Sequence, residues 1–575
     1  MSALLPVQSS RRLMWLLALL TAVAIMIVMR LFYWQVMRHD DLQQKLVEDR
    51  GQTVVLLARR GDIVSSDGVL LATDIYNYEI AAHPPQIKSP EVLAASLAPI
   101  LNTTQGELLR LLTQKDSTVM LTRNAPFTVG SQISLLGEKV NLSGIDLNTT
   151  SVRRYPNNRL AAHILGFVSG ERHGAYGIEQ YYDEILSGRP GQTTGESNAL
   201  RDEMLWFESG SVTSPVDGAT LVLTLNSGIQ GIAERELATA MNDTKATAGQ
   251  IIILDANTSA ILALASYPAP DLNAYSTTNL KEYEDPAASL LYEPGSVFKV
   301  VTLAAGLDSN RINANTSFND TGSVTVGGRT FYNHDFLHPG QVNLVDVMKM
   351  SLNVEACKIS MTTGAKSFYQ YLHDFGFGSV SGVDVAGELP GVVKNPGDGL
   401  WYESDLCSNA FGQGIAVTPL QMANALVTVA NGGKLMRPYI VAKIVRPDGS
   451  TETRSPVMIR QVLRPETARL VTDILAQSIG TESINQAVVP GYRIAGKTGT
   501  AQIPIPGGYD AKWTIASFGG YFPAAHPQYV ILVKLDRPTS SEWGSVVASP
   551  VFARVAQQLA QLTGLPPDDV RGAGK

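Results

Sequence analysis

A long apolar segment close to the N-terminus constrains this chain more than any other feature. No charged residue lies between Leu13 and Met29, and only Arg30 interrupts an apolar run that continues to Met37. About 20 helical residues span the ~30 Å hydrocarbon layer of a bilayer. The range 13–34 therefore predicts one transmembrane helix, with the Arg30 side chain extending to the interface.

The charges that flank this segment predict its orientation. Arg11 and Arg12 precede it, whereas residues 38–41 carry mixed charges. The positive-inside rule places residues 1–12 in the cytoplasm and the bulk of the chain outside the cell membrane, as a single-pass protein. A cleaved signal peptide is the alternative. The length of the segment, and the lack of a small-residue cleavage site after it, favour an uncleaved anchor.

Composition excludes several classes of function. The 575 residues carry 45 Lys and Arg against 52 Asp and Glu, a net charge of -7, which gives no indication of a nucleic-acid partner. Hydrophobic residues make up 45% of the chain and charged residues 17%, so we expect large cores and two to four folded units. Two cysteines are too few for a four-cysteine zinc site, and we expect no metal and no cofactor.

The pattern along the chain changes near residue 215. Before it, short strand-like pieces and turn clusters indicate a mixed α+β region, which ends in a stretch rich in Gly, Ser, Thr and Pro. After it, helices are expected at 229–241, 297–307, 344–358, 419–430, 465–477 and 550–562. Strands are expected at 219–225, 249–265 (as a hairpin), 408–414, 492–502, 513–522 and 528–535. Strands at both ends predict one sheet assembled from distant segments.

The first of three short motifs is a serine–lysine pair. Ser296 and Lys299 lie three residues apart at the start of the predicted helix 297–307, so both side chains share one helix face. Serine becomes a nucleophile when a base removes its proton, and lysine is a base when burial or a second cation lowers its pKa. Because this spacing occurs by chance about once or twice in such a chain, the pair alone establishes nothing.

Two further motifs strengthen the hypothesis. Ser351 and Asn353 form an S-x-N motif near the start of the predicted helix 344–358, and residues 497–500 read K-T-G-T on a predicted strand. A strand with a cation, two hydroxyls and a glycine can hold a carboxylate while its N–H groups face a reacting carbonyl. Coincidence of all three motifs, in this order and on these elements, is improbable.

The three motifs together resemble the penicillin-recognising serine acyltransferases. Residues 153–156 and 177–179 resemble the pedestal of class B penicillin-binding proteins, and residues 412–421 resemble their transpeptidase domain. One departure from the family pattern is the pair Ser65 and Ser66, where the family usually has Asp-Arg.

This resemblance implies an α/β fold class and a domain order. We expect an α/β/α transpeptidase domain around an antiparallel sheet, on an elongated α+β pedestal of the dimerisation type, with one N-terminal transmembrane helix. The implied segments are a cytoplasmic N-terminus at 1–12, the transmembrane helix at 13–34, the pedestal at 40–215, the transpeptidase domain at 216–565 and a C-terminal tail at 566–575.

The resemblance also assigns roles to the motif residues. Ser296 would attack the D-Ala-D-Ala carbonyl of a peptidoglycan stem peptide, with Lys299 as general base. Ser351 would relay a proton to the leaving amine, and Asn353 would hold both the Lys299 amine and the substrate. The substrate carboxylate and oxyanion would bind the K-T-G-T strand, through Lys497, Thr498, Gly499 and Thr500.

The implied function is a serine D,D-transpeptidase that cross-links peptidoglycan in septal or spore wall synthesis and is inhibited covalently by β-lactams. Its implied partners are stem peptides, β-lactams, the membrane, a polytopic glycosyltransferase of the shape, elongation, division and sporulation (SEDS) family, and other cell-wall proteins. Three alternatives remain open: a β-lactamase-like acyl hydrolase, a membrane-anchored β-lactam sensor, and an inactive scaffold.

The cysteines and histidines are expected to have other roles. Cys357 and Cys407 could form a reversible disulfide beside the active site, but base rates favour two buried free thiols. We interpret His163, His334 and His338 as structural, because no acidic residue accompanies them at a suggestive spacing.

Overall fold

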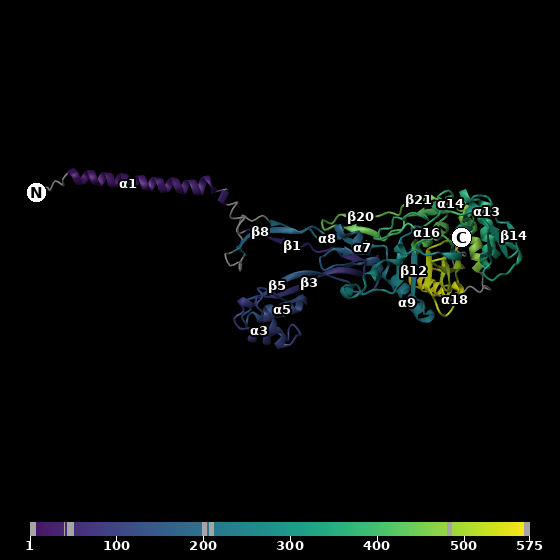
Figure 1. The fold of residues 1–575 in the computed structure, drawn as a ribbon, viewed down its shortest axis with the longest axis horizontal. Helices are drawn as coiled ribbons and strands as arrows, with labels where there is room; N and C mark the ends of the chain where they lie inside the picture. The colour runs from purple at the N-terminus through teal and green to yellow at the C-terminus, as the bar shows by residue number, and fades with distance from the viewer. Residues whose placement is uncertain are drawn as a thin grey trace. The chain divides into compact units, whose positions relative to one another are not determined.

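The computed structural model of the chain describes residues 7–39, 41–42, 51–197, 204–205, 212–479 and 486–568. Contacts between residues divide it into two compact units. One unit is Met1–Ala58 with Arg189–Asp217, and the other is Arg59–Gly188 with Gly218–Lys575. Figure 1 draws the elements of both units, coloured by residue number.

The first unit contains a long helix and a small antiparallel sheet. Helix α1 (Val7–Phe32) continues into one π-helical turn, η1 (Tyr33–Met37). In the sheet, the central strand is β8 (Gly191–Ser197), and its partners are β1 (Gly51–Leu56), β9 (Met204–Leu205) and β10 (Val212–Thr213).

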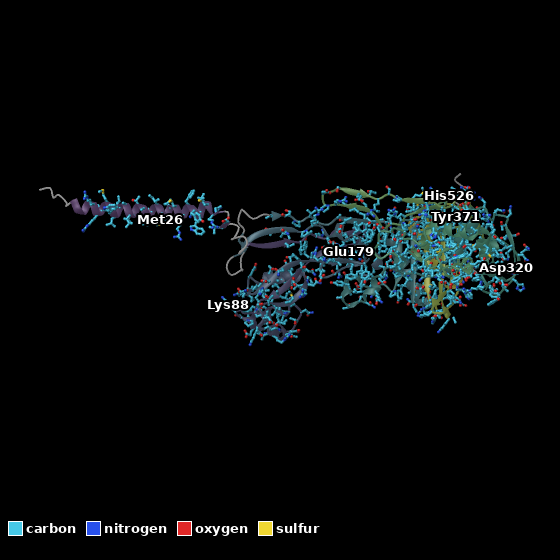
Figure 2. All side chains as sticks on the ribbon, turned by 45° about the horizontal axis from the view of Figure 1, so that its top comes forward. Met26, Lys88, Glu179, Asp320, Tyr371 and His526 are labelled. Carbon is cyan, nitrogen blue, oxygen red and sulfur yellow. A yellow bond between two sulfur atoms is a disulfide. The ribbon has the colours of Figure 1, made fainter. Side chains whose placement is uncertain are left out.

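Helix α1 has the length and composition of a membrane-spanning helix. Residues Arg11–Met37 have a mean hydropathy of 2.3, and among the described residues this is the one helix long and apolar enough to cross a bilayer. Its apolar side chains are exposed, with Trp15 at 77% and Met26 at 65%. Figure 2 shows side chains projecting from both sides of the helix around Met26. An apolar surface of this extent fits a lipid environment.

The second unit begins with a sheet covered by three short helices. The long strand β3 (Leu70–Ala82) pairs antiparallel with β4 (Val119–Pro126) and β5 (Ile145–Arg154). Ile80 on β3 packs with Leu97 and Leu108 of the covering helices in one apolar core. These helices are α3 (Pro90–Leu97), α4 (Gln105–Leu112) and α5 (Phe127–Leu136), and Figure 1 shows α3 and α5 beside β3 and β5.

The same sheet continues into the later part of the chain. Strand β2 (Ile63–Val64) pairs with β3 and, in parallel, with β11 (Thr220–Leu223). Strand β11 also pairs with β19 (Val441–Val445), which pairs with β20 (Thr451–Thr453). Strands from both sides of residue 215 therefore belong to one sheet, which explains why both regions lie in one compact unit.

The two serines that depart from the family pattern lie in the turn between β2 and β3. The Ser65 hydroxyl accepts a hydrogen bond from the Val69 N–H at 2.9 Å, and the Ser66 N–H donates to the Leu225 carbonyl at 2.8 Å. The first bond closes the turn, and the second ties it to the segment after β11. Serine is therefore sufficient at both positions, where the family usually has the charged residues Asp and Arg.

A five-stranded antiparallel sheet forms the centre of the second unit, in the order β13-β12-β24-β23-β22. Strands β12 (Ala248–Asp255) and β13 (Ile261–Tyr267) form the predicted hairpin. The other edge of β12 pairs with β24 (Tyr529–Asp536), and β23 (Gly508–Phe522) and β22 (Ala495–Ile505) follow. The expectation of one sheet built from both ends of this region is confirmed for the strands predicted at 249–265, 492–502, 513–522 and 528–535. It was wrong for 219–225, because that strand is β11 of the other sheet.

Helices cover both faces of this sheet, because its strands are apolar on both sides. Ile251 and Ile253 of β12 belong to one core, with α9 (Ser227–Thr244) and α19 (Ser549–Thr563). Ile252 and Leu254 belong to a second core, with α11 (Lys299–Asp308), α16 (Pro419–Ala430) and α17 (Pro465–Ile479). Alternate side chains of a strand point to opposite faces. The result is the α/β/α arrangement that the family resemblance implied.

Short elements complete the fold. Those in the first half of the second unit are η2 (Pro84–Gln86), α6 (Ala162–Leu165), β6 (Phe167–Val168), β7 (Gly174–Ala175), α7 (Gly177–Tyr181), α8 (Asp183–Ser187), η3 (Leu272–Thr277), η4 (Leu280–Tyr283) and α10 (Pro286–Ser289). Those that follow are β14 (Ser317–Asp320), β15 (Ser323–Val326), β16 (Arg329–Tyr332), β17 (Gly340–Asn343), α14 (Ala365–Asp374), β18 (Lys434–Met436), β21 (Met458–Gln461) and α18 (Gly544–Val547).

Two predicted elements differ from the structure. The range 344–358 contains two helices, α12 (Leu344–Lys349) and α13 (Asn353–Thr363), separated at Ser351, whose φ is +56°. The range 408–414 is not a strand: it begins inside α15 (Glu403–Ala410) and continues as a turn. The prediction was wrong because residues 406–410 are all buried, including the polar Ser408 and Asn409, so polarity along this helix does not follow exposure.

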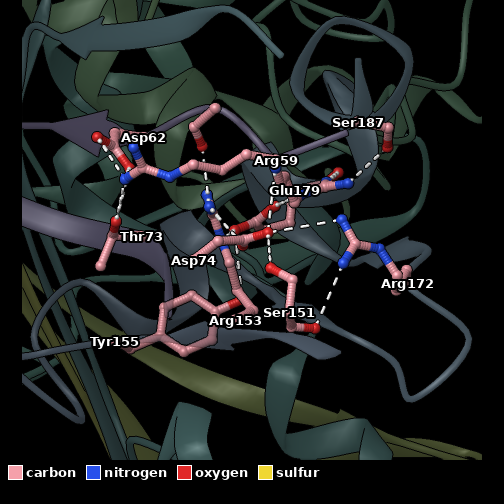
Figure 3. Close-up of polar contacts among 12 residues, drawn as sticks. Arg59, Asp62, Thr73, Asp74, Ser151, Arg153, Tyr155, Arg172, Glu179 and Ser187 are labelled. Atoms are coloured by element: carbon pink, nitrogen blue, oxygen red, sulfur yellow. Dashed lines mark hydrogen bonds and ion pairs between the residues drawn. The ribbon is translucent and has the colours of Figure 1, made fainter. Parts of the chain in front are cut away.

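A buried ion-pair network joins helix α7 to the strands before it. The carboxylate of Glu179, which is fully buried, accepts hydrogen bonds from Arg60 Nε at 2.6 Å and Arg153 Nε at 2.7 Å. Arg153 Nη1 also pairs with Asp74 at 3.3 Å, and Arg60 Nη1 with Asp183 at 2.6 Å. Figure 3 shows Glu179, Arg153 and Asp74 converging from separate elements. Each buried charge is therefore compensated by an opposite charge.

The first prediction concerns this network. We expect Glu179→Ala to lower stability by about 3–5 kcal/mol, because Arg60 and Arg153 would remain buried without their shared carboxylate. Thermal unfolding of the full chain in detergent, followed by intrinsic fluorescence, measures the effect as a lower Tm. Glu171→Ala removes an exposed glutamate from the same region and is the matched control. Equal Tm values for the two variants would contradict a stabilising role for the network.

The two cysteines form a disulfide rather than the free thiols that base rates favoured. Cys357 on α13 and Cys407 on α15 have Cα atoms 4.4 Å apart and lie 50 residues apart in the sequence. The two helices lie side by side, as the hydrogen bond from Ser360 Oγ to the Leu406 carbonyl at 2.8 Å also shows. This proximity arises from tertiary packing, which the spacing of the cysteines does not reveal.

The second prediction concerns this cross-link. The double variant Cys357→Ala/Cys407→Ala should lower the Tm, since a cross-link closing a loop of this length contributes about 3–5 kcal/mol. Alkylation of the denatured wild-type protein should add no label without reductant and two labels after reduction, as measured by intact mass. The single variant Cys357→Ala should take one label without reductant. Two labels on unreduced wild-type protein would contradict the disulfide.

Candidate active site

The candidate nucleophile lies in a tight turn at the start of a helix. Ser296 belongs to the 3-10 turn η5 (Gly295–Phe298), which leads directly into α11. Gly295 has a φ of +57°, and its N–H donates to the Gly412 carbonyl at 3.0 Å. A side chain at Gly412 would lie 2.2 Å from the Gly295 carbonyl oxygen. The segment 412–421, which resembles the family's transpeptidase domain, therefore packs against this turn and fixes the backbone at Ser296.

Two lysine side chains converge on one serine. Lys299 Nζ donates to the Ser351 carbonyl at 2.5 Å, to Asn353 Oδ1 at 2.8 Å and to Ser351 Oγ at 3.3 Å. Lys497 Nζ donates to the same Ser351 Oγ at 2.9 Å and to Thr498 Oγ1 at 3.2 Å. The three sequence motifs, from helix α11, the α12–α13 junction and strand β22, therefore meet at one hydroxyl.

The backbone at Ser351 makes this convergence possible. Its left-handed φ of +56° interrupts the chain between α12 and α13. A residue with a side chain rarely adopts this conformation, and here it turns both the carbonyl and the hydroxyl of Ser351 towards Lys299. Helix α13 then starts at Asn353, which places the amide of Asn353 against the same amine.

Burial changes the protonation of both lysines. Lys299 is 1% exposed and Lys497 is 2% exposed. Burial lowers the pKa of Lys497 to about 7. Burial, together with the charge of Lys497, lowers the pKa of Lys299 well below its ordinary value. Both effects favour the neutral amine of Lys299, which is the form that a general base requires.

Strand β22 forms one wall of the site. Thr500 Oγ1 accepts a hydrogen bond from the Gly544 N–H at 3.2 Å, which ties β22 to the segment before α18. Gly499 faces the interior: an added Cβ would lie 2.4 Å from Ser517 Oγ and 2.9 Å from Val297 Cγ2. Glycine is therefore required here by close packing of the strand against the nucleophile turn, and Thr498 and Thr500 lie on the cavity side.

Six of the eight predicted site residues line a cavity of about 990 Å³, and Lys299 and Gly499 lie behind its wall. Ser296, Ser351, Asn353, Lys497, Thr498 and Thr500 all contribute to its wall. A hydroxyl, a lowered-pKa amine, a second cation and the edge strand of a sheet suit attack on a carbonyl beside a carboxylate. Within the described residues, no group of three or more His, Cys, Asp or Glu side chains could hold a metal ion.

The structure also places His334 in this cavity, although the sequence suggested a structural role for it. His334 follows β16, and its ring lies 5.4 Å from the Trp543 ring between centroids. Neither residue belongs to a motif, and their separation in sequence carries no signal that could have found them. His163, by contrast, is buried, and burial lowers its pKa to about 4, which fits the structural role that we expected.

Two family models match this chain. The model described as "Penicillin binding protein transpeptidase domain" matches residues 249–557, more than half of the chain. The model described as "Penicillin-binding Protein dimerisation domain" matches residues 55–223.

Two relatives match almost the whole chain. Stage V sporulation protein D of Bacillus subtilis is 29% identical over 566 residues, which cover 97% of this chain and 86% of the relative. Penicillin-binding protein PbpB of Mycobacterium tuberculosis is 30% identical over 576 residues, which cover 93% and 83%.

Solved structures give the same result. A peptidoglycan synthetase from Bifidobacterium adolescentis has a TM-score of 0.71 and 26% identity, and the match covers 90% of this chain and 98% of that one. Penicillin binding protein 3 of Mycobacterium tuberculosis, in complex with aztreonam, has a TM-score of 0.69 and 26% identity, with coverage of 89% and 98%. The motif geometry, the two family models and these relatives agree, and the chain belongs to the class B penicillin-binding proteins, a family of serine-type peptidoglycan D,D-transpeptidases.

Proposed function

We propose that this chain cross-links peptidoglycan through an acyl-enzyme on Ser296. The observation that carries this proposal is the convergence of Lys299 and Lys497 on the Ser351 hydroxyl, in a cavity that Ser296 also lines. The substrate is a stem peptide that ends in D-Ala-D-Ala, and β-lactams acylate the same serine.

In the acylation step, the neutral Lys299 amine takes the proton from Ser296 Oγ. The Oγ atom then bonds to the carbonyl carbon of the penultimate D-Ala, and the C–N bond to the terminal D-Ala breaks. Ser351, which lies between the two lysines, delivers the proton to the leaving amine. Asn353 keeps the Lys299 amine in place during this transfer.

The wall formed by β22 binds the rest of the substrate. Lys497, when protonated, attracts the terminal carboxylate, and the hydroxyls of Thr498 and Thr500 donate hydrogen bonds to it. The backbone N–H groups of Ser296 and Thr500 form the oxyanion hole, in which each donor contributes about 3 kcal/mol to transition-state stabilisation. Gly499 contributes by allowing β22 to approach the nucleophile turn.

An acceptor amine from a second stem peptide completes the reaction. Its nitrogen attacks the acyl carbon, the ester bond to Ser296 breaks, and the new amide is the cross-link. A β-lactamase-like hydrolase or a β-lactam sensor would use the same acylation chemistry. A near full-length match to the peptidoglycan D,D-transpeptidase FtsI homologue of Mesostigma viride, which covers 94% of this chain and 93% of that one, favours the transpeptidase.

We further propose a membrane topology and a division into domains. Residues 1–12 are cytoplasmic, 13–34 cross the membrane and the remainder is extracytoplasmic, as Arg11 and Arg12 support. The pedestal comprises 40–215, the transpeptidase domain 216–565 and a tail 566–575, which the two family-model matches support.

The same proposal includes a polymerase partner. Glycan strands must be made close to the enzyme that cross-links them, so a polytopic SEDS-family glycosyltransferase would bind the transmembrane helix and the pedestal. The names of the relatives, a sporulation protein and homologues of FtsI, support a role in septal or spore wall synthesis.

The third prediction tests the nucleophile. Fluorescent penicillin should label the purified full-length protein covalently and should leave Ser296→Ala unlabelled, because the hydroxyl that forms the ester is missing. Ser309→Ala removes a serine from the end of the same helix, α11, and should label like wild type. Labelling of Ser296→Ala would disprove the mechanism. Loss of the wild-type label within seconds would favour the acyl hydrolase.

The fourth prediction concerns pH. Lys497 is protonated below its pKa of about 7 and neutral above it, so its attraction for a carboxylate falls as pH rises. We expect the second-order rate of acylation by benzylpenicillin to decline from pH 7 to pH 9 by up to about tenfold per pH unit. Lys497→Arg retains the positive charge, so the decline in its acylation rate should occur at higher pH, whether or not the variant acylates as fast as wild type. A wild-type rate that is constant to pH 9 would contradict this role of Lys497.

A further inference from the structure

His334 is held over the active site by its neighbour in the sequence. The side chain of Asn333, 1% exposed, accepts a hydrogen bond from the Val354 N–H at 3.1 Å and donates to Asp320 at 2.9 Å and to the Leu337 carbonyl at 3.1 Å. Asn333 therefore ties the loop after β16 to the first turn of α13, the helix that Asn353 begins. His334 is fixed relative to Ser351 and Asn353 while its own side chain remains accessible to solvent.

Trp543 comes from the opposite wall. The next residue, Gly544, donates its N–H to Thr500 Oγ1, and an added Cβ there would lie 2.3 Å from the Gly499 carbonyl oxygen. The backbone beside Trp543 is thus packed directly on β22. The centroids of the His334 and Trp543 rings lie 5.4 Å apart at the cavity. The two rings therefore connect the side of the cavity that carries Ser351 and Asn353 with the side formed by β22.

The cross-linking step requires a group that acylation does not. A free primary amine arrives at neutral pH as an ammonium ion, with one proton more than the leaving amine of the first step. Lys299 and Ser351 can carry only the proton that returns to Ser296 when the ester breaks. The extra proton must therefore be removed by another base before the amine can attack.

We propose that Trp543 and His334 form the acceptor subsite: the indole face of Trp543 binds the acceptor ammonium, and the imidazole of His334 takes its extra proton. The neutral amine nitrogen then attacks the acyl carbon of Ser296 and the ester C–O bond breaks. The proton that this nitrogen loses as it becomes an amide passes through Lys299 and Ser351 to Ser296 Oγ. His334 finally releases its proton to solvent. The ligand class is a primary amine, as on a diamino-acid side chain.

The surroundings of His334 suit this role. Partial burial and the positive charge at the Lys299–Lys497 pair lower its pKa, and Asp335 on its own loop opposes them. A lowered pKa favours the neutral imidazole, which is the form that can accept a proton. The other charged groups that line the cavity are Arg329, Lys349, Asp510 and Glu542. An aromatic face binds an ammonium ion through its π electrons, by about 0.5–2 kcal/mol.

The test separates the two half-reactions of the full-length protein in detergent. A thiolester analogue of the stem peptide acylates the enzyme, and a peptide with a free lysine ε-amine competes with water for the acyl group. We expect His334→Gln to lower the ratio of aminolysis to hydrolysis at pH 7 at least tenfold, while acylation by penicillin changes less than threefold. Hydroxylamine, which is already neutral at pH 7, should react with the acyl-enzyme of both proteins at similar rates.

Matched variants complete the experiment. His338→Gln alters a histidine on the same loop that lies outside the cavity lining of the described residues, and its ratio should equal that of wild type. Trp543→Leu should raise the acceptor concentration needed for half-maximal aminolysis, and Trp543→Phe should restore much of the binding. Three results for His334→Gln would overturn the proposal. They are an unchanged ratio of aminolysis to hydrolysis, a loss of penicillin acylation as large as the loss of aminolysis, and an equally large loss of the reaction with hydroxylamine.

The inference rests on the proposed acyl-Ser296 intermediate. The penicillin labelling of Ser296→Ala tests that intermediate independently. Normal labelling of wild type combined with an unchanged ratio in His334→Gln would therefore disprove the acceptor subsite alone.

Discussion

The Ser351 hydroxyl is the group on which this site depends, because one oxygen accepts hydrogen bonds from two buried lysines. Two ammonium ions at this separation repel each other, and burial penalises both charges. Both effects favour the loss of a proton from the pair, which gives the state that a general base needs. The same contacts that assemble the three motifs thus also activate the nucleophile.

The left-handed backbone conformation of Ser351 separates α12 from α13. A left-handed non-glycine residue costs about 1–3 kcal/mol, and here it ends α12 so that α13 can begin two residues later. The N-terminus of α13 carries a partial positive charge that disfavours a protonated Lys299 beside it. The helix break therefore supplies the acceptor atoms and the electrostatic field together, which an unbroken helix over 344–358 could not do.

The sequence was sufficient for the parts of this structure that depend on local pattern. The β12–β13 hairpin and the coincidence of three motifs were predicted from the residues, the family resemblance added the α/β/α layers, and the structure brings the motif residues together as expected. Tertiary packing decided the rest. The left-handed Ser351, the Cys357–Cys407 disulfide and the approach of His334 to Trp543 each result from elements that meet only in the folded chain. No local periodicity or spacing encodes them.

The two halves of the proposed reaction differ in how rigidly the fold holds their groups. Lys299, Lys497 and Gly499 lie on elements of the central core, where close contacts leave no room for displacement. His334 and Trp543 lie on loops, each attached to the core mainly through the adjacent residue. Acylation therefore depends on the packing of the whole domain, whereas the acceptor side can change by loop substitution without disturbing the nucleophile. An enzyme built this way can retain one donor chemistry while it adapts to different acceptor amines.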